Sequence, residues 1–496
     1  MTPITGKTKK VFVVLLASVF MFASAQMTMA GKGSKKPKAK NVILMISDGQ
    51  GFNHMRVTDY FTGIAPVYEK FGHKFGMQTC SANNQSGYDA VAMAANFEYA
   101  KNGATDSASA ATAMYTGIKI YDGQINMTTE QEPITTYFEM AAQAGKSIGA
   151  VSSVEFSHAT PAAVYGHNSS RNNYAAIGYE GVYGSNPLDN APNDSSDGPT
   201  APFAGNNDLY DALNYYDNLK VLMGAGSGDY DDNGAYDPTR TDRYVGGADA
   251  WADIKDSEPN GWTFVESKED FEAVADGMLH PEKMLGVAQV NSTLQQSRDE
   301  GAPMNANVPT LETMTKAALN VLDDNSAGFA VMIEGGAVDW AGHANQLDRL
   351  IEEQIDFNNA VQAVVDYLEN NTNGNNWGNT LLIVTADHET GYLWGDGTGS
   401  FFDVNDNGVF DEGTDYAHVT NNGVGILPGA SFHSGSHTNS LVPLFAKGAG
   451  SEAFNFCIEG RDPNLKAIYD LDDSWNGKYI DNTCVYQVMK NASFGR

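Results

Sequence analysis

Residues 41–51 read Asn-Val-Ile-Leu-Met-Ile-Ser-Asp-Gly-Gln-Gly, an apolar run that ends at an acid followed by glycine. An unbroken apolar run of this kind is typical of a strand buried on both faces of a parallel sheet. Asp48 would then stand at the carboxyl end of the strand, where open α/β sheets bind their ligands. The alternative is an Asp-Gly turn that only reverses the chain.

Similar apolar runs alternate with amphipathic helical patterns along the rest of the chain, and no repeat of 20–50 residues is present. This alternation predicts an α/β fold, with a doubly wound, mostly parallel sheet and helices on both faces. Further strands are predicted at 148–154, 220–223, 328–333, 380–385 and 441–446, and helices at 134–144, 309–322 and 346–368.

Two stretches, at about 184–260 and 395–429, depart from this pattern because they are rich in Asp, Asn and Gly. Such composition is typical of surface segments and not of sheet core. We therefore predict one domain over residues 41–496 that carries two acidic surface insertions.

Each insertion contains a loop with oxygen-bearing side chains at positions 1, 3, 5 and 9 and a glycine at position 6. This spacing is typical of a calcium loop, although neither loop has the glutamate expected at position 12. We favour calcium binding, and a solvated turn is the alternative. The candidate ligands are Asp229, Asp231, Asn233 and Asp237 in the first loop, and Asp403, Asn405, Asn407 and Asp411 in the second.

The amino-terminal segment has the pattern of a secretory signal. Lysines precede an apolar run at residues 11–23, which leads into Ala-Ser-Ala at residues 23–25. We predict a signal peptide over residues 1–25, with cleavage after Ala30 as the alternative, and a basic leader over residues 26–40. The apolar run is too short to span a bilayer, and no later run is longer. We therefore expect a periplasmic or extracellular protein whose mature form has no membrane anchor.

The formal net charge is −31, and the first forty residues contain lysines but no acid, so the rest of the chain is more acidic still. This balance argues against binding nucleic acid or anionic lipid through a general positive field. Two of the three cysteines, Cys457 and Cys484, lie close in sequence and are predicted to form a disulfide in an oxidising compartment. Cys80 would be a buried free thiol.

Residues 104–112 read Ala-Thr-Asp-Ser-Ala-Ser-Ala-Ala-Thr. Ser107 would open a helix of small residues, which let a substrate approach closely, and a helix amino terminus favours an anion. Ser107 is therefore a candidate nucleophile. The alternative is an ordinary helix start with Asp106 or Ser107 as its N-cap.

Acids and histidines follow several of the predicted strands, and parallel strands end at one edge of a sheet. Mixed carboxylate and imidazole ligands without thiolate favour catalytic zinc. A set containing only oxygen ligands, Asp48, Thr160 and Glu334, favours magnesium. The other candidate ligands are Asp339, His343, Asp387, His388 and His437, with His433 as the alternative to His437.

These residues resemble, in order, the motifs of the alkaline phosphatase family. The matching stretches are 41–51, 105–112, 158–171, 334–343, 385–388 and 437–438. The resemblance implies that one zinc ion is held by Asp339, His343 and His437. It implies that a second is held by Asp48, Asp387 and His388, with Ser107 bound to it, and that magnesium is held by Asp48, Thr160 and Glu334.

The resemblance also implies that Arg171 binds the phosphate and that Asp106 holds Arg171 in place. Residues 41–496 would then form a secreted, metal-dependent phosphomonoesterase that acts through a phosphoserine at Ser107, with two zinc ions and one magnesium ion. Arginine suits the role, since its planar fork binds two phosphate oxygens at once. Family members are commonly homodimers, so the resemblance also implies a homodimer.

Two positions vary between branches of the family. This chain has His158 and Trp340, as in the marine and cold-adapted bacterial branch, where other members carry aspartate and lysine. The lysine reaches the phosphate through water, so its absence is expected to change the affinity for substrate and product.

Two other classes of function compete with this interpretation. A phosphodiesterase or sulfatase is disfavoured because sulfatases need proline two residues after the nucleophile, where this chain has Ser109. Diesterases lack the arginine and the third metal site. A secreted calcium-binding structural protein would need none of the ordered ligand set.

Overall fold

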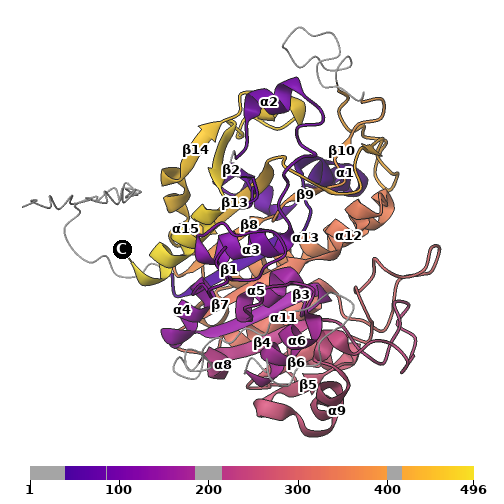
Figure 1. The fold of residues 1–496 in the computed structure, drawn as a ribbon, viewed down its shortest axis with the longest axis vertical. Coiled ribbons are helices and arrows are strands. Elements are labelled where there is room, and N and C mark those ends of the chain that lie inside the picture. The colour runs from indigo at the N-terminus through magenta and orange to yellow at the C-terminus, as the bar shows by residue number, and fades with distance from the viewer. Residues whose placement is uncertain (1–38, 85–86, 185–214, 399–415, 496) are drawn as a thin grey trace, which may run out of the picture. The chain divides into compact units, whose positions relative to one another are not determined.

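An 11-stranded sheet with the order β14-β15-β2-β13-β8-β1-β7-β3-β4-β6-β5 is the centre of the computed structural model (Figure 1). The structure describes residues 39–84, 87–184, 215–398 and 416–495. Strands from β8 to β5 in this order are parallel, whereas β13 is antiparallel to β8 and β2. The predicted mostly parallel sheet is thereby confirmed. The strands of the sheet are β1 (Asn41–Ser47), β2 (His73–Gln78), β3 (Ser147–Glu155), β4 (Leu219–Ala225), β5 (Thr263–Val265), β6 (Met284–Val287), β7 (Phe329–Gly335), β8 (Thr380–Thr385), β13 (Val442–Gly448), β14 (Ile458–Arg461) and β15 (Lys478–Asp481).

Helices lie on both faces of this sheet (Figure 1). Two-residue strands form two small additional sheets, in which β9 (Glu389–Thr390) pairs with β12 (His437–Thr438) and β10 (Leu393–Trp394) pairs with β11 (Ser431–Phe432). The helices are α1 (Phe52–Thr62), α2 (Ala90–Ala95), α3 (Ser107–Thr116), α4 (Tyr137–Gln143), α5 (Ala159–Tyr165), α6 (Tyr174–Tyr183), α8 (Tyr215–Asn218), α9 (Ala248–Ser257), α10 (Lys268–Ala275), α11 (Leu311–Leu322), α12 (Ala337–His343), α13 (Leu347–Glu369), α14 (Leu465–Ile468) and α15 (Thr483–Phe494), with short 3₁₀ turns at Val67–Lys70, Arg243–Val245, Pro259–Gly261, Thr372–Gly374 and Ser451–Phe456.

The apolar run of β1 is unbroken because both of its faces are covered. Val42 and Leu44 pack into a core shared with α3, α4, α5 and α15. Ile43 and Met45 pack into the opposite core, shared with α1, α11 and α13. Full burial of such a side chain stabilises the fold by roughly 1.5–3 kcal/mol. A polar residue at any of these positions would therefore face a core and not water.

The predicted strand at 220–223 lies within the range predicted as the first insertion. β4 lies between β3 and β6, and nearly all of its residues are buried, so residues 184–260 are not wholly a surface segment. β5 and β6 extend the sheet further and were not predicted, because strands of 3 and 4 residues show too little periodicity. The predicted strand at 220–223 is thus part of the sheet core. Residues 185–214 and 399–415 lie outside the described residues.

The carboxyl ends of β3, β7, β1 and β8 meet at one edge of the sheet, since these parallel strands are neighbours. Asp48 follows β1, Asp387 follows β8, and Glu334 is the penultimate residue of β7. Asp339 lies on α12, directly after β7. This topology brings acids that are distant in sequence to one place.

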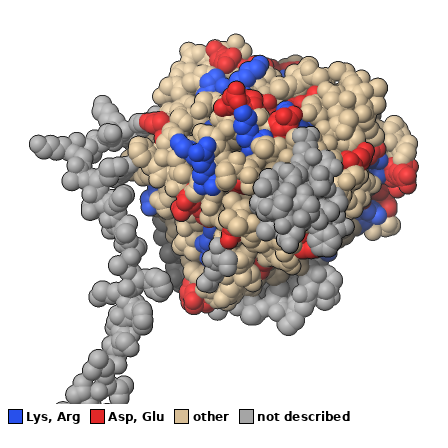
Figure 2. Space-filling view, turned by 90° about the horizontal axis from the view of Figure 1, so that it is seen from above, with Lys and Arg blue, Asp and Glu red and all other residues tan. Residues whose placement is uncertain are grey.

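The surface view in Figure 2 shows basic and acidic side chains interspersed on the face it presents. Among the helices that the structure describes, none has both the length and the apolar character needed to cross a bilayer.

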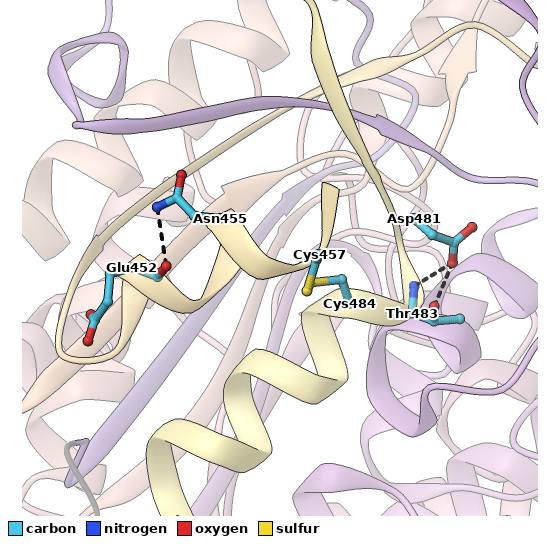
Figure 3. Close-up of a disulfide and its surroundings, with 6 residues drawn as sticks. All are labelled: Glu452, Asn455, Cys457, Asp481, Thr483 and Cys484. Atoms are coloured by element: carbon cyan, nitrogen blue, oxygen red, sulfur yellow. Dashed lines mark hydrogen bonds between the residues drawn. A yellow bond between two sulfur atoms is a disulfide. The ribbon is translucent and has the colours of Figure 1, made fainter. Parts of the chain in front are cut away.

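A disulfide closes the carboxyl-terminal region (Figure 3). It joins Cys457, just after the 3₁₀ turn Ser451–Phe456, to Cys484 in the first turn of α15, as predicted. Cys80 is buried and free. Because α15 packs against α3, which begins at Ser107, the disulfide also anchors a neighbour of the site helix.

We expect the double variant Cys457→Ser, Cys484→Ser to lose roughly 3 kcal/mol of unfolding free energy, because the crosslink closes a loop of 27 residues. Urea unfolding with and without reductant measures this. Reductant should destabilise wild type and the Cys80→Ser control but leave the double variant unchanged. Equal stability of wild type and double variant would show that the crosslink contributes nothing.

Candidate metal and phosphate site

Ser107 is the first residue of α3, and its Oγ lies 3.1 Å from Nε2 of His388. Asp106 is the N-cap, and its Oδ1 accepts a hydrogen bond of 3.0 Å from the backbone of Ser109. The alanines of the first turns are buried, so α3 packs closely against its neighbours. Ser107 is 1% exposed and is directed toward the carboxylate and histidine cluster.

The first group of potential metal ligands consists of Asp339, His343 and His437. Nε2 of His343 lies 3.4 Å from Oδ2 of Asp339, and Nε2 of His437 lies 3.5 Å from its Oδ1. Each Nδ1 lies 2.8 Å from a backbone carbonyl, of Gly435 and Thr105 respectively. When each Nδ1 donates to its carbonyl, Nε2 is left free to bind a metal. Asp339 and His343 are four residues apart on α12, so both side chains lie on one face of that helix, as predicted.

The second group consists of Asp48, Asp387 and His388, all fully buried. Nε2 of His388 lies 3.5 Å from Oδ1 of Asp48 and 3.3 Å from Oδ2 of Asp387. Nδ1 of His388 lies 3.3 Å from the hydroxyl of Thr390, which donates to Asp339 of the first group. Thr390 thus links the two groups.

The third group contains Asp48, His158 and Glu334. The hydroxyl of Ser152 donates to Glu334, and Thr160 lies near the same carboxylate, on α5. The Oγ1 of Thr160 is buried and has no hydrogen-bond partner in the described part of the chain. His158, which the sequence marked only as a position that varies between branches, has a ring nitrogen within 4.8 Å of carboxylate oxygens of Asp48 and Glu334.

Several buried oxygen atoms in these groups have no hydrogen-bond partner among the described residues. They are both carboxylate oxygens of Asp48, Oε1 of Glu334 and Oδ2 of Asp387. An unpaired buried charge is costly. Burial raises the pKa of Glu334 to about 8 and of Asp387 to about 6, and neighbouring carboxylates contribute to both shifts. The oxygen and nitrogen donors fit divalent zinc and magnesium, whose charge would compensate the carboxylates.

The pKa values of the histidines in the site shift in opposite directions. Burial, together with Arg171, lowers the pKa of His158 to about 3, and burial places the pKa of His388 well below its usual value. Burial also lowers the pKa of His437, but its hydrogen bonds to Asp339 and to the Thr105 carbonyl, together with the nearby carboxylate charges, outweigh burial and raise the pKa to about 9. Because a metal binds neutral imidazole, metal binding at His437 has to release a proton.

Arg171 is held by two neighbours at the mouth of the site. Its Nη1 donates to Oδ2 of Asp106 at 3.0 Å, and its Nη2 lies 3.1 Å from Nε2 of His158. Burial raises the pKa of Asp106, but the charge of Arg171 and the hydrogen bonds from Arg171 and Ser109 together outweigh it, so the pKa lies below its usual value. Asp106 is therefore both the predicted N-cap and the predicted partner of Arg171. Trp340 completes this side, with its ring 6.0 Å from that of His158.

A pocket of about 730 Å³ opens in front of Ser107 and Arg171. Its lining also includes Gln296, Ser297 and Gln346, which sequence reasoning missed. No sequence signal could have identified them, since amides and hydroxyls are common in loops. His433 packs against Phe97 and lies in none of the ligand groups of the described chain, whereas His437 does.

The first predicted calcium loop is a turn whose carboxylates are bonded to protein donors. Asp231 accepts from the backbone of Asn233 and Ala235, and Asp229 pairs with Lys255 at 2.6 Å. The candidate ligands Asp229, Asp231 and Asp237 belong to none of the ligand groups found in the described residues. The second loop, with Asp403, Asn405, Asn407 and Asp411, lies outside the described residues. Calcium binding stays a prediction.

The chain matches the family model of alkaline phosphatase over residues 39–403. It is 30% identical over 392 residues to alkaline phosphatase H of Pseudomonas aeruginosa, covering 73% of this chain and 72% of that protein. The alkaline phosphatase of the Antarctic bacterium TAB5 is 25% identical with a TM-score of 0.60, covering 93% of this chain and 100% of that one. A histidine-to-aspartate mutant of that enzyme, described with magnesium in its M3 site, is 23% identical with a TM-score of 0.59, covering 92% and 99%. The chain belongs to the alkaline phosphatase family, and it is a phosphoric monoester hydrolase.

Proposed function

We propose that this enzyme transfers the phosphoryl group of a monoester to Ser107 and then to water. The observation that carries the proposal is the position of the Ser107 hydroxyl, 3.1 Å from His388 and at the amino terminus of α3. A serine hydroxyl is a weak nucleophile until a base or a cation lowers its pKa. The buried, acid-rich groups around it supply the ligands for such a cation.

We propose that the first and second ligand groups hold zinc and that the third holds magnesium. When bound, these ions lower the pKa of a bound hydroxyl or water and compensate the charge that develops on phosphate and leaving-group oxygens. The histidines of the first two groups suit zinc. The third group contains two carboxylates and the unpaired hydroxyl of Thr160, which suit magnesium, although His158 adds a nitrogen.

Arg171 would bind two non-bridging phosphate oxygens through its planar guanidinium. Asp106 keeps the guanidinium in place and stays ionised, because Arg171 holds its pKa below the usual range.

Secretion and a homodimer are further parts of the proposal. The signal-like residues 1–25 and the disulfide between Cys457 and Cys484 both agree with an oxidising compartment. The dimer rests on family resemblance alone.

Replacing Ser107 by alanine should lower turnover of a chromogenic phosphomonoester by roughly 1,000-fold or more, because the phosphoryl acceptor is lost. Bound zinc should be unchanged. Ser474→Ala, at an exposed position, is the matched control and should keep full activity. Retention of most activity by Ser107→Ala would refute the nucleophile assignment.

Elemental analysis of active protein should give two zinc ions and one magnesium ion per chain, and chelation should abolish activity.

Chelation should also lower the melting temperature of the protein, and this decrease should become larger as pH rises from about 5 to 8. The reason is that the raised pKa of Glu334 lets the metal-free folded state bind a proton that the unfolded state loses in this window. Less than one zinc ion per active chain would contradict the assignment. So would a melting-temperature difference between metal-bound and chelated protein that becomes smaller as pH rises.

His158→Asp should strengthen magnesium retention, because it adds a carboxylate to the third group. Trp340→Lys should lower the inhibition constant of inorganic phosphate, because it adds a positive charge near the bound phosphate. Each effect should be about 1–2 kcal/mol, or roughly tenfold. Magnesium dialysis and phosphate inhibition of the single and double variants measure them. If wild type and Trp340→Lys are inhibited equally, residue 340 does not sense phosphate.

A further inference from the structure

The catalytic groups form only part of the pocket lining. The rest of the lining includes Gln296 and Ser297, from the loop after β6, and Gln346, which precedes α13. With the phosphate held by Arg171 and the ligand groups, the alcohol part of a monoester has to occupy the remaining space of the pocket. These other lining residues are therefore the ones available to contact the alcohol.

This loop is held firmly against α13. Arg298 forms a two-bonded ion pair with Glu352, at 2.5 and 2.7 Å, and it also donates to the backbone carbonyls of Gln295 and Ala302. Arg349 of α13 donates to backbone carbonyls of the loop at Gln295 and Asp299. Since Glu352 neutralises Arg298 and most of its donors are used, Arg298 fixes the loop and is not a second phosphate ligand.

A directed chain of hydrogen bonds ends in the pocket. The hydroxyl of Ser297 donates to Oε1 of Gln296 at 3.0 Å, and Nε2 of Gln296 donates to Oε1 of Gln346 at 3.0 Å. Gln296 is 8% exposed, whereas Ser297 and Gln346 are partly exposed. Nε2 of Gln346 has no acceptor among the described residues, and the Gln346 side chain makes no capping bond to α13. Two N–H groups are thus left for a ligand.

We propose that Gln346, held by Gln296 and Ser297, binds hydroxyl groups of the leaving alcohol and makes the enzyme favour phosphate monoesters of polyols and sugars. The amide offers donors to hydroxyl oxygens, and the Ser297 oxygen accepts from hydroxyl protons. A phenyl leaving group offers neither. The competing arrangement is an aromatic leaving group packed on Trp340, which would not use Gln346. This inference rests on the proposed phosphomonoesterase function.

The test compares kcat/KM for glycerol 3-phosphate and glucose 6-phosphate with that for phenyl phosphate. Gln346→Leu should lower kcat/KM for the two polyol esters about 3- to 10-fold, as expected for one or two hydrogen bonds, and leave that for phenyl phosphate within about twofold. The inhibition constant of inorganic phosphate should not change, because phosphate carries no alcohol. Gln296→Leu should act in the same direction, since it releases Gln346.

Gln362→Leu is the matched control, because Gln362 is exposed on α13 and does not line the pocket. Its kcat/KM for each polyol ester, relative to that for phenyl phosphate, should equal the wild-type value. If Gln346→Leu leaves kcat/KM for the polyol esters relative to phenyl phosphate unchanged, the assignment of Gln346 is overturned. An equal loss of kcat/KM on all three substrates would overturn it too. A selective loss on phenyl phosphate would favour stacking on Trp340 and also overturn it. If wild type hydrolyses none of the esters, the proposed function itself fails, which is a separate result.

Discussion

The repulsion between buried carboxylates at the edge of the sheet is the constraint on which the site depends. Asp48 belongs to two ligand groups, with Asp387 in one and Glu334 in the other, and all three side chains are fully buried. Two like charges 4 Å apart repel by about 4 kcal/mol at an effective dielectric constant of 20. Only protons or cations can offset this repulsion within a folded chain. The raised pKa of Glu334 and Asp387 expresses the same repulsion and burial in the absence of cations.

The neighbouring residues can be understood from this constraint. Nδ1 of His437 lies at hydrogen-bond distance from the backbone carbonyl of Thr105, and Nδ1 of His343 from that of Gly435. Nε2 of each ring then faces the carboxylate of Asp339. Thr390 connects Asp339 to His388, so the first two groups are held in one arrangement. Ser107 meets this cluster at the start of a helix, where the backbone N–H groups favour an anion. With the proposed cations bound, a substrate phosphate would meet a site whose carboxylate charge is compensated.

Much of the sheet could be predicted because strands buried on both faces are unbroken apolar runs. β1 covers the apolar part of residues 41–51, and β8 matches the predicted 380–385, whereas the short β5 and β6 carry no such run. Acids placed directly after strands could likewise be identified from sequence. The partners of Gln346 could not, since tertiary packing alone brings a loop after β6 to the start of α13. For the same reason the sequence left His433 and His437 as alternatives, and only the geometry places His437 beside Asp339.

Anomalous X-ray diffraction at the zinc absorption edge, from crystals of protein purified without chelator, tests the central claim most directly. The account predicts two zinc peaks, one among Asp339, His343 and His437 and one among Asp48, Asp387 and His388. Each should lie about 2.0–2.1 Å from the histidine Nε2 atoms of its group. The third group should show no zinc peak. Absence of zinc from the first two groups in active protein, or a zinc peak only at another place such as residues 229–237, would contradict the account.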